Sequence, residues 1–71
     1  MIHNAVFAKS EHIESVQYDD QTDVLTVDFV GGHRYRYANV PRETYDNLAS
    51  ASSPGSYFHE RIRGRYVYRR A

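Results

Sequence analysis

The chain has 71 residues, of which 41% are hydrophobic, and it carries nine basic and nine acidic side chains and no cysteine. This length fits one small domain and excludes a multidomain enzyme. The lack of cysteine excludes disulfides and thiolate metal sites. No apolar run approaches the roughly 20 residues of a membrane-spanning helix, so we expect a cytoplasmic domain without a membrane partner.

The balanced total charge hides an uneven distribution along the chain. Residues 1–33 hold one lysine and six acids, whereas residues 34–71 hold eight arginines and three acids, so the two parts carry −5 and +5. Two interpretations follow from this division. Either the acidic part neutralises the basic part within one folded domain, or the arginines form a basic face, for which their planar guanidinium groups suit phosphates.

Alternation of apolar and polar residues predicts three strands, within residues 12–19, 24–30 and 33–38. We expect residues 1–9 to be a loosely ordered segment and residues 10–71 to form a single domain. In the first hairpin, a register with Val16 opposite Val27 and Tyr18 opposite Leu25 places apolar side chains on one face. That register leaves residues 20–23 as a four-residue loop.

The second hairpin turns at Gly31 and Gly32. A two-residue loop would place arginines among the apolar side chains, because shifting a register by one residue exchanges the faces of a strand. We therefore predict a three- or five-residue loop with a glycine in the left-handed region, Phe29 opposite Tyr35 and Asp28 opposite Arg36. The predicted apolar face comprises Val16, Tyr18, Leu25, Val27, Phe29, Tyr35 and Tyr37.

Two short helices are predicted to cover this face. Pro41 suits a helix start, and the spacing that follows it is helical. Ser53 before Pro54 predicts an N-cap and the start of a second helix, which Gly64 ends. The first apolar stripe consists of Tyr45, Leu48, Ala49 and Ser52, and the second of Phe58 and Ile62. Residues 65–69 alternate again, so the predicted fold is α+β, a three- to four-stranded antiparallel sheet with two short helices on one face, in the order β-β-β-α-α-β.

Several short motifs in this order resemble the KTSC domain, a family named for the C-terminal extension of certain lysyl-tRNA synthetases. The resemblance spans residues 10–70, and the chain is similar to stand-alone copies of the domain. It implies an RNA-binding role, and it supplies no catalytic residue or cofactor to carry over to this chain. His59 differs from the family pattern, in which asparagine is commoner after the Tyr-Phe pair. The matching residues are Ile13, Tyr18-Asp19, Leu25-Thr26-Val27-Asp28-Phe29, Gly32, Tyr35-Arg36-Tyr37, Val40-Pro41, Tyr45, Leu48, Ala51, Ser53, Gly55, Tyr57-Phe58, Ile62-Arg63 and Tyr66.

The leading functional hypothesis is a small non-catalytic module that binds RNA, with tRNA as a candidate. Arginines interleaved with tyrosines are the residue types that hold single-stranded nucleic acid. However, alternation in a strand sends the two types to opposite faces, so the tyrosines can equally be core residues. In that case the arginines contact phosphates alone, with weak and salt-sensitive affinity. The arginines predicted to bind are Arg34, Arg36, Arg61, Arg63, Arg65 and Arg69.

Other readings of the same residues remain open. Ser53, Gly55 and Ser56 at a helix start form either an anion site or an ordinary cap and turn. Tyrosine and arginine are also common at the centres of protein interfaces, so a protein adaptor or a homodimer is the alternative function. A small ribonuclease using His12 or His59 is third, although the histidines lack the spacing of a catalytic or metal motif. We expect no cofactor and no metal.

Overall fold

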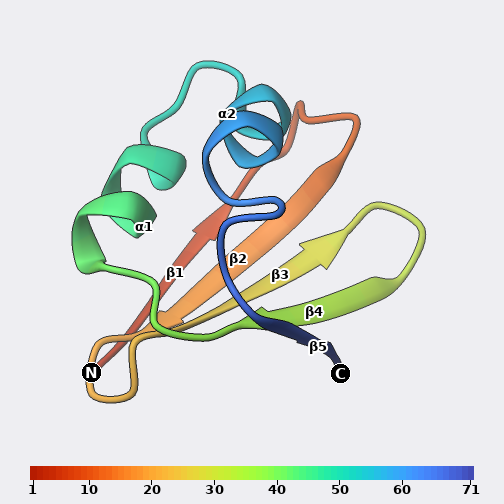
Figure 1. The fold of residues 1–71 in the computed structure, drawn as a ribbon. Coiled ribbons are helices and arrows are strands. Elements are labelled where there is room, and N and C mark those ends of the chain that lie inside the picture. The colour runs from red at the N-terminus through yellow and green to blue at the C-terminus, as the bar shows by residue number, and fades with distance from the viewer.

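The computed structural model describes residues 1–71. Five strands form one antiparallel sheet, and two helices lie in front of it in Figure 1. The elements are β1 (Ile2–Val6), β2 (Ile13–Asp19), β3 (Val24–Phe29), β4 (His33–Tyr37), α1 (Arg42–Ala49), α2 (Pro54–Arg61) and β5 (Tyr68–Arg70). No helix is both long enough and apolar enough to cross a membrane. The predicted α+β class, with two helices on one face of an antiparallel sheet, is confirmed.

The sheet has one strand more than the sequence predicted. Residues 2–6 form β1, which pairs antiparallel with β2 from Ile2 opposite Asp19 to Val6 opposite Ser15. The prediction of a loosely ordered segment is therefore wrong for these residues. Pairing with β2 supplies the backbone hydrogen bonds that the weakly apolar segment could not secure alone. The strands follow one another in chain order from β1 to β5.

The first hairpin has the predicted register. Val16 lies opposite Val27 and Tyr18 lies opposite Leu25, which leaves residues 20–23 as the four-residue loop. Asp23 ends this loop with a positive φ of 58°. The four paired side chains are buried, so the apolar pattern and the turn agree on one register.

The second hairpin has the predicted kind of loop but a different register. Its loop is residues 30–32, and Gly31 and Gly32 both have positive φ. Phe29 pairs with His33 and Asp28 with Arg34, two residues away from the predicted partners. A shift of two residues leaves every side chain on its face, so the apolar pattern could not distinguish these registers. The ion pair between Asp28 and Arg34, 2.5 Å long, forms only in the observed one.

Both helices pack on the same side of the sheet and close the core. Tyr45 and Leu48 of α1 are buried, and so are Phe58 of α2 and Ile62 directly after it. Ser52 lies beyond the end of α1, so the first apolar stripe is shorter than predicted. The buried residues are Ile13, Val16, Tyr18, Leu25, Val27, Tyr37, Val40, Tyr45, Leu48, Phe58 and Ile62, with Phe29 and Tyr35 partly buried against them.

The predicted start of α2 is confirmed, with Ser53 at the N-cap position and Pro54 in the first turn. The Ser53 hydroxyl caps no backbone N–H and instead donates to the hydroxyl of Ser56, at 3.1 Å. Gly64 has a φ of 77° and lies in the connection to β5. That strand begins at Tyr68, later than predicted, and pairs along β4, so it forms one edge of the sheet while β1 forms the other.

Candidate functional site

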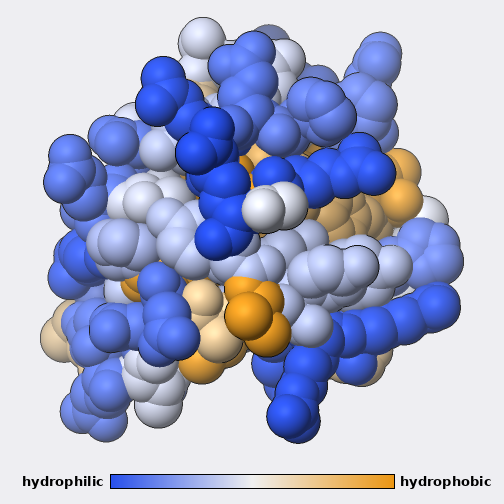
Figure 2. Space-filling model, viewed as in Figure 1, coloured by the Kyte–Doolittle hydropathy of each residue, from blue (hydrophilic) through white to orange (hydrophobic).

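A cleft of about 610 Å³ opens on the helix side of the sheet, between the end of α2 and the strands β4 and β5. Figure 2 shows pale and orange side chains exposed in this region, framed by hydrophilic ones. The cleft exists because α2 covers the middle of the sheet, whereas all three residues of β5 are exposed. Its aromatic lining consists of Phe29, Tyr35, Tyr37, Phe58 and Tyr68.

Register places the tyrosines of the cleft side by side. Directly opposed residues in antiparallel strands share a face, and Tyr37 is opposite Tyr68. The Tyr68 ring centroid lies 5.5 Å from those of Tyr35 and Tyr37. Phe58 closes the inner end with an edge-on contact to Tyr37, also at 5.5 Å. Tyr68 is nevertheless 57% exposed, so an aromatic ring is available to a ligand.

The polar lining of the cleft includes one arginine, one carboxylate and two histidines. Burial raises the pKa of Tyr37 to about 12, and the charge of Arg63 acts in the opposite direction, as expected for a guanidinium close to that ring. At the other end, the Arg70 side chain lies 3.3 Å from Nδ1 of His33. Arginine can only donate, so His33 Nδ1 is the acceptor. Glu11 is the one carboxylate among the lining residues.

Three of the predicted arginines lie on the helix side, and we call Arg61, Arg63 and Arg65 the helix-side arginines. Arg63 lines the aromatic cleft. The other two line a depression of about 280 Å³ together with Tyr57 and Tyr66. The connection between α2 and β5, residues 62–67, therefore carries arginines toward a hollow on each of its sides.

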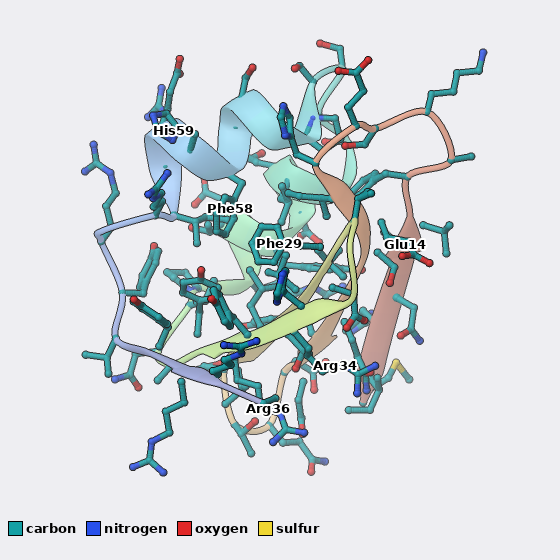
Figure 3. All side chains as sticks on the ribbon, turned by 90° about the vertical axis from the view of Figure 1, so that its right-hand side faces the viewer. Glu14, Phe29, Arg34, Arg36, Phe58 and His59 are labelled. Atoms are coloured by element: carbon teal, nitrogen blue, oxygen red, sulfur yellow. The ribbon has the colours of Figure 1, made fainter.

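The other three predicted arginines, Arg34, Arg36 and Arg69, lie on the face that no helix covers, and we call them the sheet-side arginines. Arg36 is opposite Arg69 in the register. Figure 3 shows Arg34 and Arg36 on the side of the sheet away from α2, whereas Phe29 lies between the sheet and α2. The structure thus separates the six predicted arginines into two groups instead of bringing them together.

Ion pairs engage few of these arginines. Arg34 binds Asp28, and Arg42, outside both groups, lies within 4 Å of Asp20 and Asp46. The other two sheet-side arginines and all three helix-side arginines have no carboxylate within 4.0 Å, and they are exposed. The acids of the first half of the chain therefore leave most of the candidate arginines free for a ligand.

A comparison with known proteins identifies the family that shares this architecture. The model of the KTSC domain matches residues 9–66. The chain belongs to the KTSC domain family. A crystal structure of a KTSC domain protein from Yersinia pestis superposes with a TM-score of 0.89 at 29% identity, covering 100% of this chain and 99% of the other.

Two sequence relatives differ in what surrounds the KTSC domain. A lysine–tRNA ligase of Trichormus variabilis is 38% identical over 56 residues, which are 79% of this chain and 10% of the ligase. A protein of Tsukamurella paurometabola is 34% identical over 58 residues, covering 82% of this chain and 87% of that protein. This KTSC domain thus spans about a tenth of the length of the ligase that it matches.

The predicted anion site lies in a third hollow of this KTSC domain, of about 640 Å³. Ser53, Gly55 and Ser56 line it from the start of α2, and Lys9 and His12 line it from the loop between β1 and β2. A Cβ atom on Gly55 would lie 2.9 Å from the His12 ring, so the glycine permits the close approach of this loop. A lysine and several hydroxyl groups line this hollow, but the Ser53 hydroxyl donates its hydrogen bond to the hydroxyl of Ser56.

The four histidines have different surroundings. Those at positions 12 and 33 line the aromatic cleft, and His3 lies 2.9 Å from a carboxylate oxygen of Asp20. His59 is exposed on α2, and Figure 3 shows it on the outer side of that helix. No group of three or more histidine or acidic side chains is placed to hold a metal ion. Sequence reasoning did not bring His12, His33 and Glu11 together, because only the folded hairpins make them neighbours.

Proposed function

We propose that this KTSC domain is a non-catalytic, cytoplasmic module that binds RNA through arginine contacts with phosphates. The observation that carries the proposal is the set of exposed arginines without carboxylate partners. Such contacts release counterions from nucleic acid, so the binding is weak and sensitive to salt. The lysine–tRNA ligases among the relatives support tRNA as the first RNA to test.

The helix-side arginines are the better candidates for this contact. They lie beside hollows that also expose aromatic rings, the combination that holds single-stranded nucleic acid. On the sheet side, Arg34 is already paired with Asp28, and no aromatic residue lines the depression of about 290 Å³ beside Arg34 and Arg36. A base would therefore find no ring to stack on there.

Titration of a labelled tRNA and of a short single-stranded RNA, at low and at moderate salt, tests the proposal. The triple variant Arg61→Glu, Arg63→Glu, Arg65→Glu should lose binding at both salt concentrations. A single Arg36→Glu variant is the control, because it reverses one charge on the sheet side. It should bind RNA nearly as well as the unmodified chain. The absence of RNA binding even at low salt would refute the proposal. The RNA should be recovered intact after binding. Cleavage of the RNA that is lost in the His12→Ala or His59→Ala variant would instead indicate a ribonuclease.

A protein-interaction module is the alternative function, and the free edge of β1 favours it. Only β2 pairs with β1, so the backbone groups on its other side are free to add a strand. Ile2 and Val6 of β1 are 45% and 76% exposed. A homodimer detected by native mass measurement, together with protein binding that survives the triple arginine variant, would support this function. A strictly monomeric chain would count against the homodimer.

A further inference from the structure

We propose that the aromatic cleft holds one unpaired RNA base, stacked on Tyr68, with the phosphates on its two sides at Arg63 and Arg70. This inference rests on the proposed RNA-binding function and names the part of the RNA that the cleft recognises. It predicts selection of single strands, because bases in a duplex are already stacked on their neighbours and show no free face.

The first argument is the exposed ring. Tyr68 keeps more than half of its surface in contact with water, although Tyr35 and Tyr37 pack against it. The volume of about 610 Å³ lies within the usual range for small-ligand sites, roughly 300 to 1,000 Å³. A base placed on Tyr68 would extend an existing row of rings and cover the apolar surface that α2 leaves open.

The second argument is the charge around the ring. Arg63 lines the cleft beside Tyr37 and Tyr68, and Arg70 reaches the cleft through its contact with His33. Neither arginine has a carboxylate within 4.0 Å. An exposed ring in a cleft with two guanidinium groups that lack carboxylate partners matches a nucleotide, which joins a flat base to anionic phosphates. An apolar protein side chain would cover the ring but leave both cations without an anionic partner.

The third argument concerns the edge of the base. Glu11 and His12 line the cleft near Val30, and the backbone N–H of Val30 donates to the carbonyl of His12. This end is away from Tyr68, which pairs at the opposite end of β4. A carboxylate would repel phosphate but accept a hydrogen bond from the amino group of a base. The cleft thus has Arg63 at the Tyr37 end and Arg70 at the His33 end, and Glu11 is an acceptor for the amino group of a base.

Binding of matched RNAs to Tyr68 variants tests the inference. The probes are a short single-stranded RNA and a duplex with the same number of phosphates. Tyr68→Ala should weaken single-strand binding by about 5- to 150-fold, the usual effect of losing one base–aromatic stack, and should leave duplex binding nearly unchanged. Tyr68→Phe should restore the affinity. Val67→Ala is the matched control, since Val67 is 75% exposed beside Tyr68 but does not line the cleft.

The outcomes separate this inference from the proposed function. Equal effects of Tyr68→Ala on the single strand and the duplex, or no effect on either, would overturn the base site while leaving RNA binding through arginines intact. If the unmodified chain binds no RNA, the proposed function fails, and adenosine and cytidine monophosphate then serve as probes in a backbone-amide NMR titration. Shifts confined to the cleft residues and abolished by Tyr68→Ala would support a nucleotide site, and the absence of shifts would refute it.

Discussion

The salt dependence of RNA binding distinguishes the two faces of the sheet. For a single strand, the slope of log affinity against log salt concentration is about −0.7 for each neutralised phosphate. The candidate phosphate contacts on the helix side number four, the three helix-side arginines and Arg70. Four contacts give a slope of about −2.8 and an affinity loss of about 50-fold between roughly 50 and 200 mM salt. On the sheet side, Arg34 is occupied by Asp28, so two contacts remain, with a slope of about −1.4 and a loss of about 7-fold.

Fluorescence anisotropy with a short labelled single strand, repeated over a series of salt concentrations, measures this slope. Binding on the helix side predicts that Arg63→Ala lowers the magnitude of the slope from about 2.8 to about 2.1, because one counterion fewer is released. Arg36→Ala should leave it unchanged. A slope near −1.4 whose magnitude decreases in the Arg36→Ala variant, but not in the Arg63→Ala variant, would refute our assignment of the helix side. An affinity independent of salt would exclude phosphate contacts altogether.

Three further predictions concern the framework of the site. Tyr18→Phe removes the donor that binds the carbonyl of Val40 at 2.6 Å, which should lower the free energy of unfolding by about 1–3 kcal/mol in urea denaturation. Burial also raises the pKa of Tyr18 to about 12, so the unmodified chain should lose stability as the pH rises from 10 towards 12, and the variant should lose less over that interval. The hydrogen bond from the N-terminal ammonium group lowers the pKa of Asp20 from 3.8 to about 2, so the stability it contributes is present above pH 4 and lost as the pH falls towards 2. The Asp20→Asn variant should show a weaker dependence of melting temperature on pH between pH 4 and pH 2, and an unchanged dependence would contradict this prediction. Gly55→Ala should lower the free energy of unfolding by about 1–3 kcal/mol, because the added Cβ meets the His12 ring. Adding His12→Ala to the same chain should recover this stability, which a double-mutant cycle would measure.

The hairpins show which parts of the fold the sequence could predict. The register of β2 with β3 was predictable because the apolar pattern and a four-residue turn allow one pairing. For β3 with β4, the pattern excluded only odd shifts, and the observed register is the one that also pairs Asp28 with Arg34. The strand β1 was missed because Ile2 and Val6 face away from the helices, and of its apolar residues only Ala5 packs against the core.

The candidate site was less predictable than the fold. Alternation correctly separated Arg34 and Arg36 from the tyrosines of β4, but it could not show that Tyr68 would remain uncovered. That exposure depends on how far α2 extends across the sheet, which the apolar residues of the helix do not specify. The division of the six arginines between two faces has the same origin, since Arg61 and Arg63 are positioned by a helix and its exit, whereas Arg36 and Arg69 are positioned by strand pairing.

The meander order of the sheet has a consequence for how this unit can be combined with others. Because neighbouring strands are consecutive in the chain, the first and last strands are the two outermost, and both chain ends leave from them. A polypeptide fused to either end would continue outward from the periphery and would not have to thread between paired strands. The same fold can therefore be joined to the end of another protein, which agrees with the match of this chain to about a tenth of a much longer ligase.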